Sequence, residues 1–304
     1  MVNIYLTKPR GFCAGVERAI GTVELVLQKY SKPVYVRHQI VHNQHVVNEL
    51  EKKGAIFVEN LNEIPKDSNV IFSAHGIPPE VMEEAKRLNL NFIDATCPLV
   101  TKVHIEAKLY YQRGYDIILI GHKGHQEVIG TMGYAPMMLV ENVKDVGKLD
   151  IKNDKIICLT QTTLSLDDTK EITKALKEKY PNIKFPPKED ICYATQNRQN
   201  AVKVLSDRCD LILVIGSKNS SNSNRLVETA KFKGVDSYLI QDFKDVKEDI
   251  IKYKNIGITS GASTPEILVK KVLEHLKNLF KEVNISEIVD KEENVKFVLP
   301  IELR

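Results

Sequence analysis

The stretch NFIDATCPLVTKVHIEAKLYYQRGYDIILIGH, residues 91–122, holds the pattern from which the fold class follows. Each end is a short apolar run rich in β-branched residues, which is typical of a buried strand. The middle has apolar residues three and four positions apart, which is typical of an amphipathic helix. A strand, a helix and a second strand in this order predict two parallel strands with the helix across one face. Cys97 lies at the corner between the first strand and the helix, directly before a proline that can open the helix.

The same alternation extends along the chain in both directions, and it predicts an α/β fold with small, mostly parallel sheets covered by helices. In such sheets, ligand-binding groups collect at the carboxyl ends of the strands. Further strand-like runs lie at 3–7, 33–40, 69–76, 155–160, 211–217, 237–242 and 255–261. Helical patterns lie at 14–29, 99–113, 165–179, 194–207 and 264–281.

Three cysteines occupy equivalent corners of this pattern. Cys13, Cys97 and Cys192 each lie where a helix is predicted to begin, and nearly equal lengths of chain separate them. The spacing predicts three similar α/β units in a pseudo-threefold arrangement, each bringing one thiol to a common centre. The expected units are 1–97, 98–192 and 193–281, followed by a tail at 282–304 that packs back on the body and has a strand candidate in NVKFVLP, residues 294–300.

Composition and charge exclude several classes of protein. The 304 residues carry 43 Lys and Arg against 40 Asp and Glu, which leaves no basic field of the kind that binds nucleic acid. No apolar run approaches the roughly 18 residues of a membrane span, and the N-terminus lacks the pattern of a signal peptide. The 5 cysteines are odd in number and far apart, which indicates reduced thiols. We therefore expect a cytoplasmic protein.

The three corner cysteines are candidate metal ligands. A helix N-terminus favours the thiolate, which is the metal-binding form of cysteine. Three thiolates are one short of the four that saturate a common iron–sulfur cluster or a structural zinc ion, so one coordination position would stay open for a substrate atom. A histidine that completes a tetrahedral zinc site is the alternative. Cys158 and Cys209 lack the corner placement and are assigned to the core.

Polar residues after the strands indicate an anionic ligand. His42, His75 and His125 stand beside glycines or before helical patterns, positions that suit contacts with an anion. The loops GSKNSSNSNR, residues 216–225, and TSGAST, residues 259–264, offer hydroxyl, amide and backbone N–H donors to a phosphate or diphosphate. Neither loop matches the patterns for ATP or dinucleotide binding.

Glu127 is the best candidate for a general acid. It follows His122 and His125, and a carboxylate beside a histidine can hold a proton near neutral pH. The same three residues could instead ligate zinc. Thr162, in TQTTLS, supplies a hydroxyl that could relay the proton.

Long motifs in this sequence resemble those of a known family. They are PRGFCAGVERAI, YVRHQIVHN, FSAHG, DATCPLVTKVH, GHKGHQEVIGTMG, TQTTLS, DICYATQNRQ, GSKNSSNSNRL and SGAS. In order and approximate spacing they resemble the LytB/IspH family of 4-hydroxy-3-methylbut-2-enyl diphosphate reductases, over nearly the whole chain. One departure is Gln126, where relatives often have proline.

The resemblance implies a 4Fe-4S cluster on Cys13, Cys97 and Cys192, with one iron open to the oxygen of the substrate hydroxyl. Two electrons and two protons would remove that oxygen as water and yield isopentenyl and dimethylallyl diphosphates, the last step of the non-mevalonate (MEP) isoprenoid pathway. A ferredoxin or flavodoxin would donate the electrons. The implied catalytic residues are Glu127, Thr162 and His125. The implied diphosphate-binding residues are His42, His75, His125, Ser220, Ser221, Asn222 and Ser263.

Two other functions remain open at this point. An open-cluster hydratase or dehydratase would use the iron as a Lewis acid without net electron transfer. A structural zinc protein or redox sensor would bind a phosphorylated ligand without turning it over.

Overall fold

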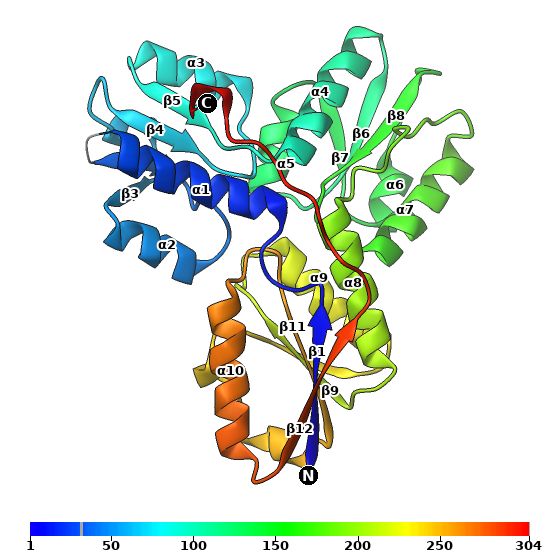
Figure 1. The fold of residues 1–304 in the computed structure, drawn as a ribbon. Helices are drawn as coiled ribbons and strands as arrows, with labels where there is room; N and C mark the ends of the chain where they lie inside the picture. The colour runs from blue at the N-terminus through cyan, green and yellow to red at the C-terminus, as the bar shows by residue number, and fades with distance from the viewer. Residues whose placement is uncertain (31–32, 304) are drawn as a thin grey trace. The chain divides into compact units, whose positions relative to one another are not determined.

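A computed structural model describes residues 1–30 and 33–303 of the chain (Figure 1). The strands described form sheets of five, four and three strands, and every strand pairing in them is parallel. This arrangement confirms the predicted α/β class with small parallel sheets. The chain divides into two compact units. The first unit is Met1–Cys13, His42–Gln44 and Tyr193–Val295, and the second unit is Ala14–Val41, His45–Cys192 and Lys296–Arg304.

The five-stranded sheet of the first unit has the order β10-β9-β11-β1-β12. The N-terminal strand β1 pairs with both β11 and β12, so the first strand of the chain joins a sheet whose other strands come from the opposite end of the sequence. The strands are β1 (Val2–Lys8), β9 (Leu211–Ile215), β10 (Asp236–Ile240), β11 (Asn255–Ser260) and β12 (Val283–Val289).

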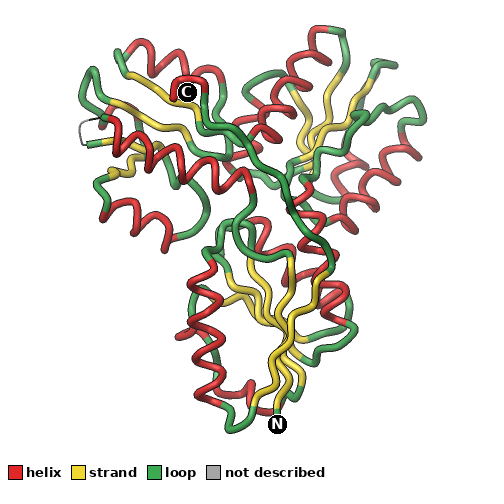
Figure 2. Tube along the Cα trace, in the orientation of Figure 1, coloured by secondary structure: helices red, strands yellow, loops and turns green. Residues whose placement is uncertain are grey.

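Helices cover both faces of this sheet, as Figure 2 shows. Leu213 and Ile258 pack in the core beneath α10, whereas Ile212 and Val214 pack beneath α8 and α9. The alternation follows from the period of two along a strand. The helices are α8 (Tyr193–Ser206), α9 (Ser221–Phe232) and α10 (Glu266–Leu279), with 3₁₀ turns η2 (Phe243–Asp245) and η3 (Glu248–Lys252).

The four-stranded sheet of the second unit has the order β3-β2-β4-β5. One face packs on α3 through Val81 and Ala85, in a core with Val70 and Phe72. The strands are β2 (Val34–Arg37), β3 (Ala55–Val58), β4 (Asn69–Phe72) and β5 (Asn91–Asp94). The helical elements are α1 (Ala14–Lys29), α2 (Gln44–Lys52), η1 (Leu61–Glu63), α3 (Pro79–Arg87) and η4 (Ile301–Leu303).

The three-stranded sheet of the second unit has the order β7-β6-β8. Ile118 of β6 faces a core shared with α7, whereas Ile117 faces a core shared with α4 and α5. The strands are β6 (Asp116–Ile120), β7 (Met137–Val140) and β8 (Ile156–Thr160). The helices are α4 (Pro98–Gln112), α5 (Gln126–Met132), α6 (Val143–Lys148) and α7 (Leu166–Lys179).

The strands β3, β7 and β12 are not predicted from the sequence, and the strand predicted at 294–300 is wrong. Residues 294–299 have no regular structure. Instead β12 forms at Val283–Val289, shortly after α10, and pairs with β1 along its whole length. The segment that directly follows α10 pairs with β1 and so supplies the strand. Among the residues described, no helix is both long and apolar enough to cross a membrane.

Candidate active site

Glu127 is buried at the carboxyl end of the three-stranded sheet, and both oxygens of its carboxyl group accept hydrogen bonds. Thr162, which follows the neighbouring strand β8, donates its amide to Oε1 at 2.6 Å and its hydroxyl to Oε2 at 3.0 Å. Glu127 is 3% exposed. Burial raises the pKa of Glu127 to about 7, although the hydrogen bonds from Thr162 act in the opposite direction. The group therefore binds and releases a proton near neutral pH.

His125 caps the helix that carries Glu127. Its Nδ1 accepts a hydrogen bond from the Glu127 amide at 3.2 Å, so the neutral ring carries its proton on Nε2. His75, in the loop after β4, lies edge-on to His125 with 6.0 Å between ring centroids. The Ser73 hydroxyl is 3.2 Å from His75 Nδ1. Both rings are half-buried and can present a nitrogen to an anionic ligand.

Main-chain hydrogen bonds connect Cys97 and Cys192 to these residues. The Cys97 amide donates to the carbonyl of Ala74, next to His75, at 3.0 Å, and the Cys192 amide donates to the Thr162 carbonyl at 3.0 Å. Both thiols are half-buried, and each precedes a helix. Within the second unit, a chain of contacts thus connects the following residues: Cys192, Thr162, Glu127, His125, His75 and Cys97.

In the first unit, Asn222 joins the loops that follow the neighbouring strands β9 and β11. Its Oδ1 accepts from the Ala262 amide at 2.8 Å, and its amide nitrogen donates to the Thr195 hydroxyl at 3.3 Å. The Gly261 amide donates to the Ile215 carbonyl at 2.9 Å, across the same two loops. Because the strands are parallel, the helices α9 and α10 begin at the same edge of the sheet, where backbone N–H groups favour an anion.

Serine side chains fill the space between the two loops. Ser220 is the N-cap of α9, and its hydroxyl accepts hydrogen bonds from the amide and the hydroxyl of the fully buried Ser223, at 3.3 and 3.1 Å. A Cβ at Gly216 would lie 2.2 Å from Ser223 Oγ, and a Cβ at Gly261 would lie 2.1 Å from it. The loops can approach this closely because both positions are glycine. Ser221, the first residue of α9, is half-buried beside them.

Cys13 and Ser263 lie at the same loops. The Cys13 amide donates to the Ala262 carbonyl at 3.2 Å. The Ser263 hydroxyl donates to the His42 carbonyl at 3.1 Å. Asn219, which the sequence does not single out, places its side-chain amide 3.5 Å from His42 Nδ1. The first unit thus gathers a second set of candidate residues: Cys13, His42, Ser220, Ser221, Asn222 and Ser263.

Arg198 is a further residue that the sequence analysis does not identify. Its fully buried guanidinium donates to the Gly11 carbonyl at 2.7 Å and to the Ala194 carbonyl at 2.9 Å, and it forms an ion pair with Glu293 at 3.1 Å. These contacts fix the loop before α1. The sequence does contain a signal for this role. Arg198 lies on the same face of the helix as the apolar Leu205, and a charged side chain on a buried face requires a partner.

The other two cysteines differ from the corner thiols. Cys158 is fully buried inside β8, and Cys209 is buried before β9. Burial raises the pKa of Cys158 far above its ordinary value and raises the pKa of Cys209 to about 12. These thiols stay protonated and are poor metal ligands. None of the five cysteines forms a disulfide.

Two of the three candidate zinc ligands, Glu127 and His125, are engaged by hydrogen bonds within the protein. Thr162 occupies both oxygens of Glu127, and the Glu127 amide occupies His125 Nδ1. Within residues 1–30 and 33–303, no three His, Cys, Asp or Glu side chains gather closely enough to hold a metal ion.

Comparison with known proteins places the chain in a family. Residues 4–277 match the family model described as LytB protein. The chain is 54% identical over 310 residues to the 4-hydroxy-3-methylbut-2-enyl diphosphate reductase of Psychromonas ingrahamii, covering 100% of this chain and 98% of the relative. It is 50% identical over 306 residues to the enzyme of the same name from Chromobacterium violaceum, covering 99% and 98%.

Solved structures agree with this result. The E-1-hydroxy-2-methyl-but-2-enyl-4-diphosphate reductase from Plasmodium falciparum superposes with a TM-score of 0.97 at 45% identity, covering 99% of this chain and 96% of that one. A solved (E)-4-hydroxy-3-methyl-but-2-enyl diphosphate reductase, described as the terminal enzyme of the non-mevalonate pathway, gives a TM-score of 0.66 at 34% identity, covering 91% and 100%. Because the matches extend over nearly the whole length of each chain, this chain belongs to the LytB family.

Proposed function

We propose that this protein reduces 4-hydroxy-3-methylbut-2-enyl diphosphate to isopentenyl and dimethylallyl diphosphates, the last step of the non-mevalonate isoprenoid pathway. Two electrons and two protons enter, the carbon–oxygen bond of the hydroxyl breaks, and water leaves. Membership of the LytB family supports the reaction. The observation that carries it is the chain of contacts in the second unit, which connects a titratable acid to two histidines and to two half-buried cysteines.

Cys13, Cys97 and Cys192 are the proposed ligands of a 4Fe-4S cluster. Their chemistry fits that group, because none of them forms a disulfide and because all three, unlike Cys158 and Cys209, are half-buried and directly precede helices. When bound, such a cluster supplies single electrons and, at an iron without a protein ligand, a Lewis acid for the hydroxyl oxygen.

Glu127 is the proposed proton donor. Its pKa of about 7 keeps a proton available near neutral pH, and the two hydrogen bonds from Thr162 fix the orientation of the carboxyl group. Thr162 passes the proton toward the departing oxygen through its hydroxyl. His125 holds the first turn of α5 in place through its bond to the Glu127 amide, and it presents Nε2 to the substrate.

The diphosphate is bound by neutral donors and histidines in this proposal. The first unit contributes hydroxyl and amide groups at the start of α9 and in the loop after β11, where backbone N–H groups add to the attraction. Anchoring the diphosphate there orients the hydroxyl of the substrate. The proposed diphosphate ligands are His42, His75, His125, Ser220, Ser221, Asn222 and Ser263.

A one-electron donor of the ferredoxin or flavodoxin type is the proposed partner, because the chain has no nucleotide-binding motif that would hold a reductant of its own.

The test begins with protein purified without air. We expect iron and sulfide in the wild type, their loss in Cys13→Ser, Cys97→Ser and Cys192→Ser, and wild-type content in the control Cys158→Ser. Reduced wild-type protein should convert the substrate to both products in a single turnover. Conversion that proceeds equally without a reductant would indicate a hydratase, and zinc in place of iron would exclude the reductase.

A further inference from the structure

A single lysine connects the helix that begins after Cys97 with the segment that ends at Cys192. Lys102 lies in the second turn of α4. Its ammonium group donates to Asp190 Oδ1 at 2.6 Å and to the Lys188 carbonyl at 2.9 Å. Both acceptors belong to the irregular segment just before Cys192. The lysine therefore holds that segment at two points.

Asp190 is fixed through both of its oxygens. The second oxygen accepts a hydrogen bond from the Thr160 amide, at the end of β8, at 2.9 Å. The Asp190 side chain is 1% exposed, and a carboxylate so deeply buried requires a cation. Burial opposes the charge of Lys102, but hydrogen bonds to Asp190 and Glu106 outweigh it and raise the pKa of Lys102 above its ordinary value. The cation is therefore permanent at neutral pH.

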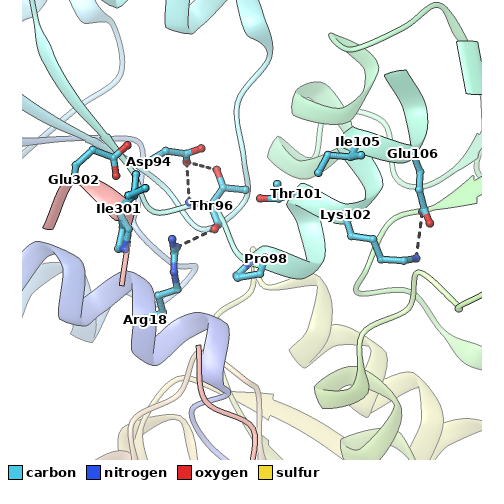
Figure 3. A pocket seen from close by; sticks show the side chains of 11 residues that line it. Arg18, Asp94, Thr96, Pro98, Thr101, Lys102, Ile105, Glu106, Ile301 and Glu302 are labelled. Carbon is cyan, nitrogen blue, oxygen red and sulfur yellow. Dashed lines mark hydrogen bonds and ion pairs between the residues drawn. The ribbon is translucent and has the colours of Figure 1, made fainter. Parts of the chain in front are cut away.

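Glu106 completes the surroundings of the ammonium group. It lies one turn further along α4, and its Oε2 is 3.2 Å from Lys102 Nζ. Figure 3 marks this ion pair with a dashed line. A cavity of about 630 Å³ opens beside these two side chains, and Thr96 and Pro98, the neighbours of Cys97 in the chain, also line it. The lysine thus lies on the cavity wall that includes the Cys97 corner.

Apolar packing and polar contacts both hold the segment before Cys192, and Ile191 and Phe185 pack in the core beside α7. Residues 185–192 form neither helix nor strand. The hydrogen bond from the Cys192 amide to the Thr162 carbonyl holds its end. The contacts of Lys102 with Asp190 and the Lys188 carbonyl, and of Asp190 with Thr160, add polar anchors two and four residues before Cys192 and connect the segment to α4.

We propose that Lys102 and Asp190 are positioning residues. They fix the position of Cys192 relative to Cys97 and so hold two of the cluster ligands at the separation that the cluster requires. This inference rests on the function proposed above, because it takes both thiols as ligands of the iron–sulfur cluster. The ion pair acts on each ligand through the main chain: through the first turns of α4 for Cys97, and through residues 188–190 for Cys192.

The experiment measures how long the cluster stays bound. Holoprotein purified without air is mixed with an excess of an iron chelator, and iron release is followed by absorbance. We expect Lys102→Met to release iron about 10- to 100-fold faster than the wild type, by analogy with the loss of metal affinity when a residue that supports a metal ligand is removed. Lys102→Arg keeps the charge and should retain most of the wild-type lifetime. Lys108→Met, an exposed lysine on the same helix, is the matched control and should not differ from the wild type.

A double variant separates the positioning of Cys192 from the cost of leaving the Asp190 carboxylate buried without its cation. Lys102→Met with Asp190→Asn removes the deeply buried carboxylate of Asp190 together with its cation and leaves only the half-buried Glu106 of this group unpaired, so the melting temperature of the cluster-free chain should recover most of its loss. Iron release should stay fast, and the electron paramagnetic resonance spectrum of the reduced cluster should stay altered, because the connection is still broken. Slow release from the double variant, or wild-type release from Lys102→Met, would overturn the positioning role alone. A wild type that binds neither iron nor sulfide would overturn the proposed function as well.

Discussion

Glu127 and Asn222 occupy equivalent positions at the carboxyl ends of two different sheets. Each is the second residue of a helix that follows a buried strand, and each accepts a hydrogen bond from a backbone amide in the loop after the neighbouring strand, Thr162 for Glu127 and Ala262 for Asn222. The residues before them also correspond, since His125 and Ser220 are the N-caps of the two helices. The architecture of the two corners is therefore the same, whereas their chemistry differs.

The difference lies in what each side chain can do with a charge. Buried Glu127 binds a proton near pH 7, so the second unit contains a group that can donate a proton. Asn222 makes the same kind of bridge with a neutral amide, so this side chain carries no negative charge at any pH. An acid suits bond cleavage, and a neutral bridge suits the binding of a diphosphate.

Glu127→Gln makes the acid corner resemble the neutral one, and it should have the largest effect. The amide can still accept from Thr162 but has no proton to transfer, so kcat should fall by roughly 10²- to 10⁴-fold, with little change in KM. Steady-state kinetics on holoprotein of verified iron content provides the measurement. The exposed Glu171→Gln on α7 is the control. A kcat near that of the wild type would remove Glu127 from the proton path.

Asn222→Asp is the reverse exchange and should act on KM. Aspartate can still accept from the Ala262 amide, so the bridge between the loops survives. The new carboxylate would face the diphosphate, and like charges in a partly dehydrated site should raise KM by about 10- to 100-fold. Asn222→Ser is the control. It also removes the side-chain amide but adds no charge, so the difference in KM between the two variants measures the repulsion between the carboxylate and the diphosphate. An equal KM for the two variants would show that charge at this position is not what matters.

The pH dependence should separate the two corners as well. Because burial raises the pKa of Glu127 to about 7, its carboxyl group is protonated below that pH and loses its proton above it. We therefore expect kcat of the wild type to fall about tenfold for each pH unit well above 7. This limb should be absent in Glu127→Gln and retained in Asn222→Asp. A wild-type profile that is flat up to pH 9 would contradict the assignment.

Much of this organisation is visible in the sequence, for physical reasons. The strand-like runs at 116–122 and 211–217 are buried, and burial selects apolar residues that a local pattern detects. The loops after them carry serine, histidine and glycine, which mark the carboxyl ends of parallel strands. The class of fold and the location of polar groups therefore follow from patterns within a few residues.

Contacts between distant segments are not visible in this way. No local pattern indicates that β1 pairs with β12, because nothing in either strand encodes its partner. Likewise the equivalence of Glu127 and Asn222 depends on which loop donates to each side chain, and the two residues share neither type nor neighbours in the sequence. Arg198 is similar, since its role depends on carbonyl groups far away in the chain.

Gly261→Ala tests the packing of the neutral corner and should have the smallest effect. The added Cβ would lie 2.1 Å from Ser223 Oγ, so the loop must shift, at a cost of about 1–3 kcal/mol in the free energy of unfolding. Ser223→Ala removes that oxygen and leaves Ser223 Cβ at 3.2 Å, so it should restore most of the loss. At Gly216 the corresponding distance to Ser223 Cβ is 2.6 Å, so the same second substitution should rescue Gly216→Ala less well. Denaturant unfolding of the four combinations measures both rescues, and equal rescue at the two glycines would show that the loops relax independently of Ser223.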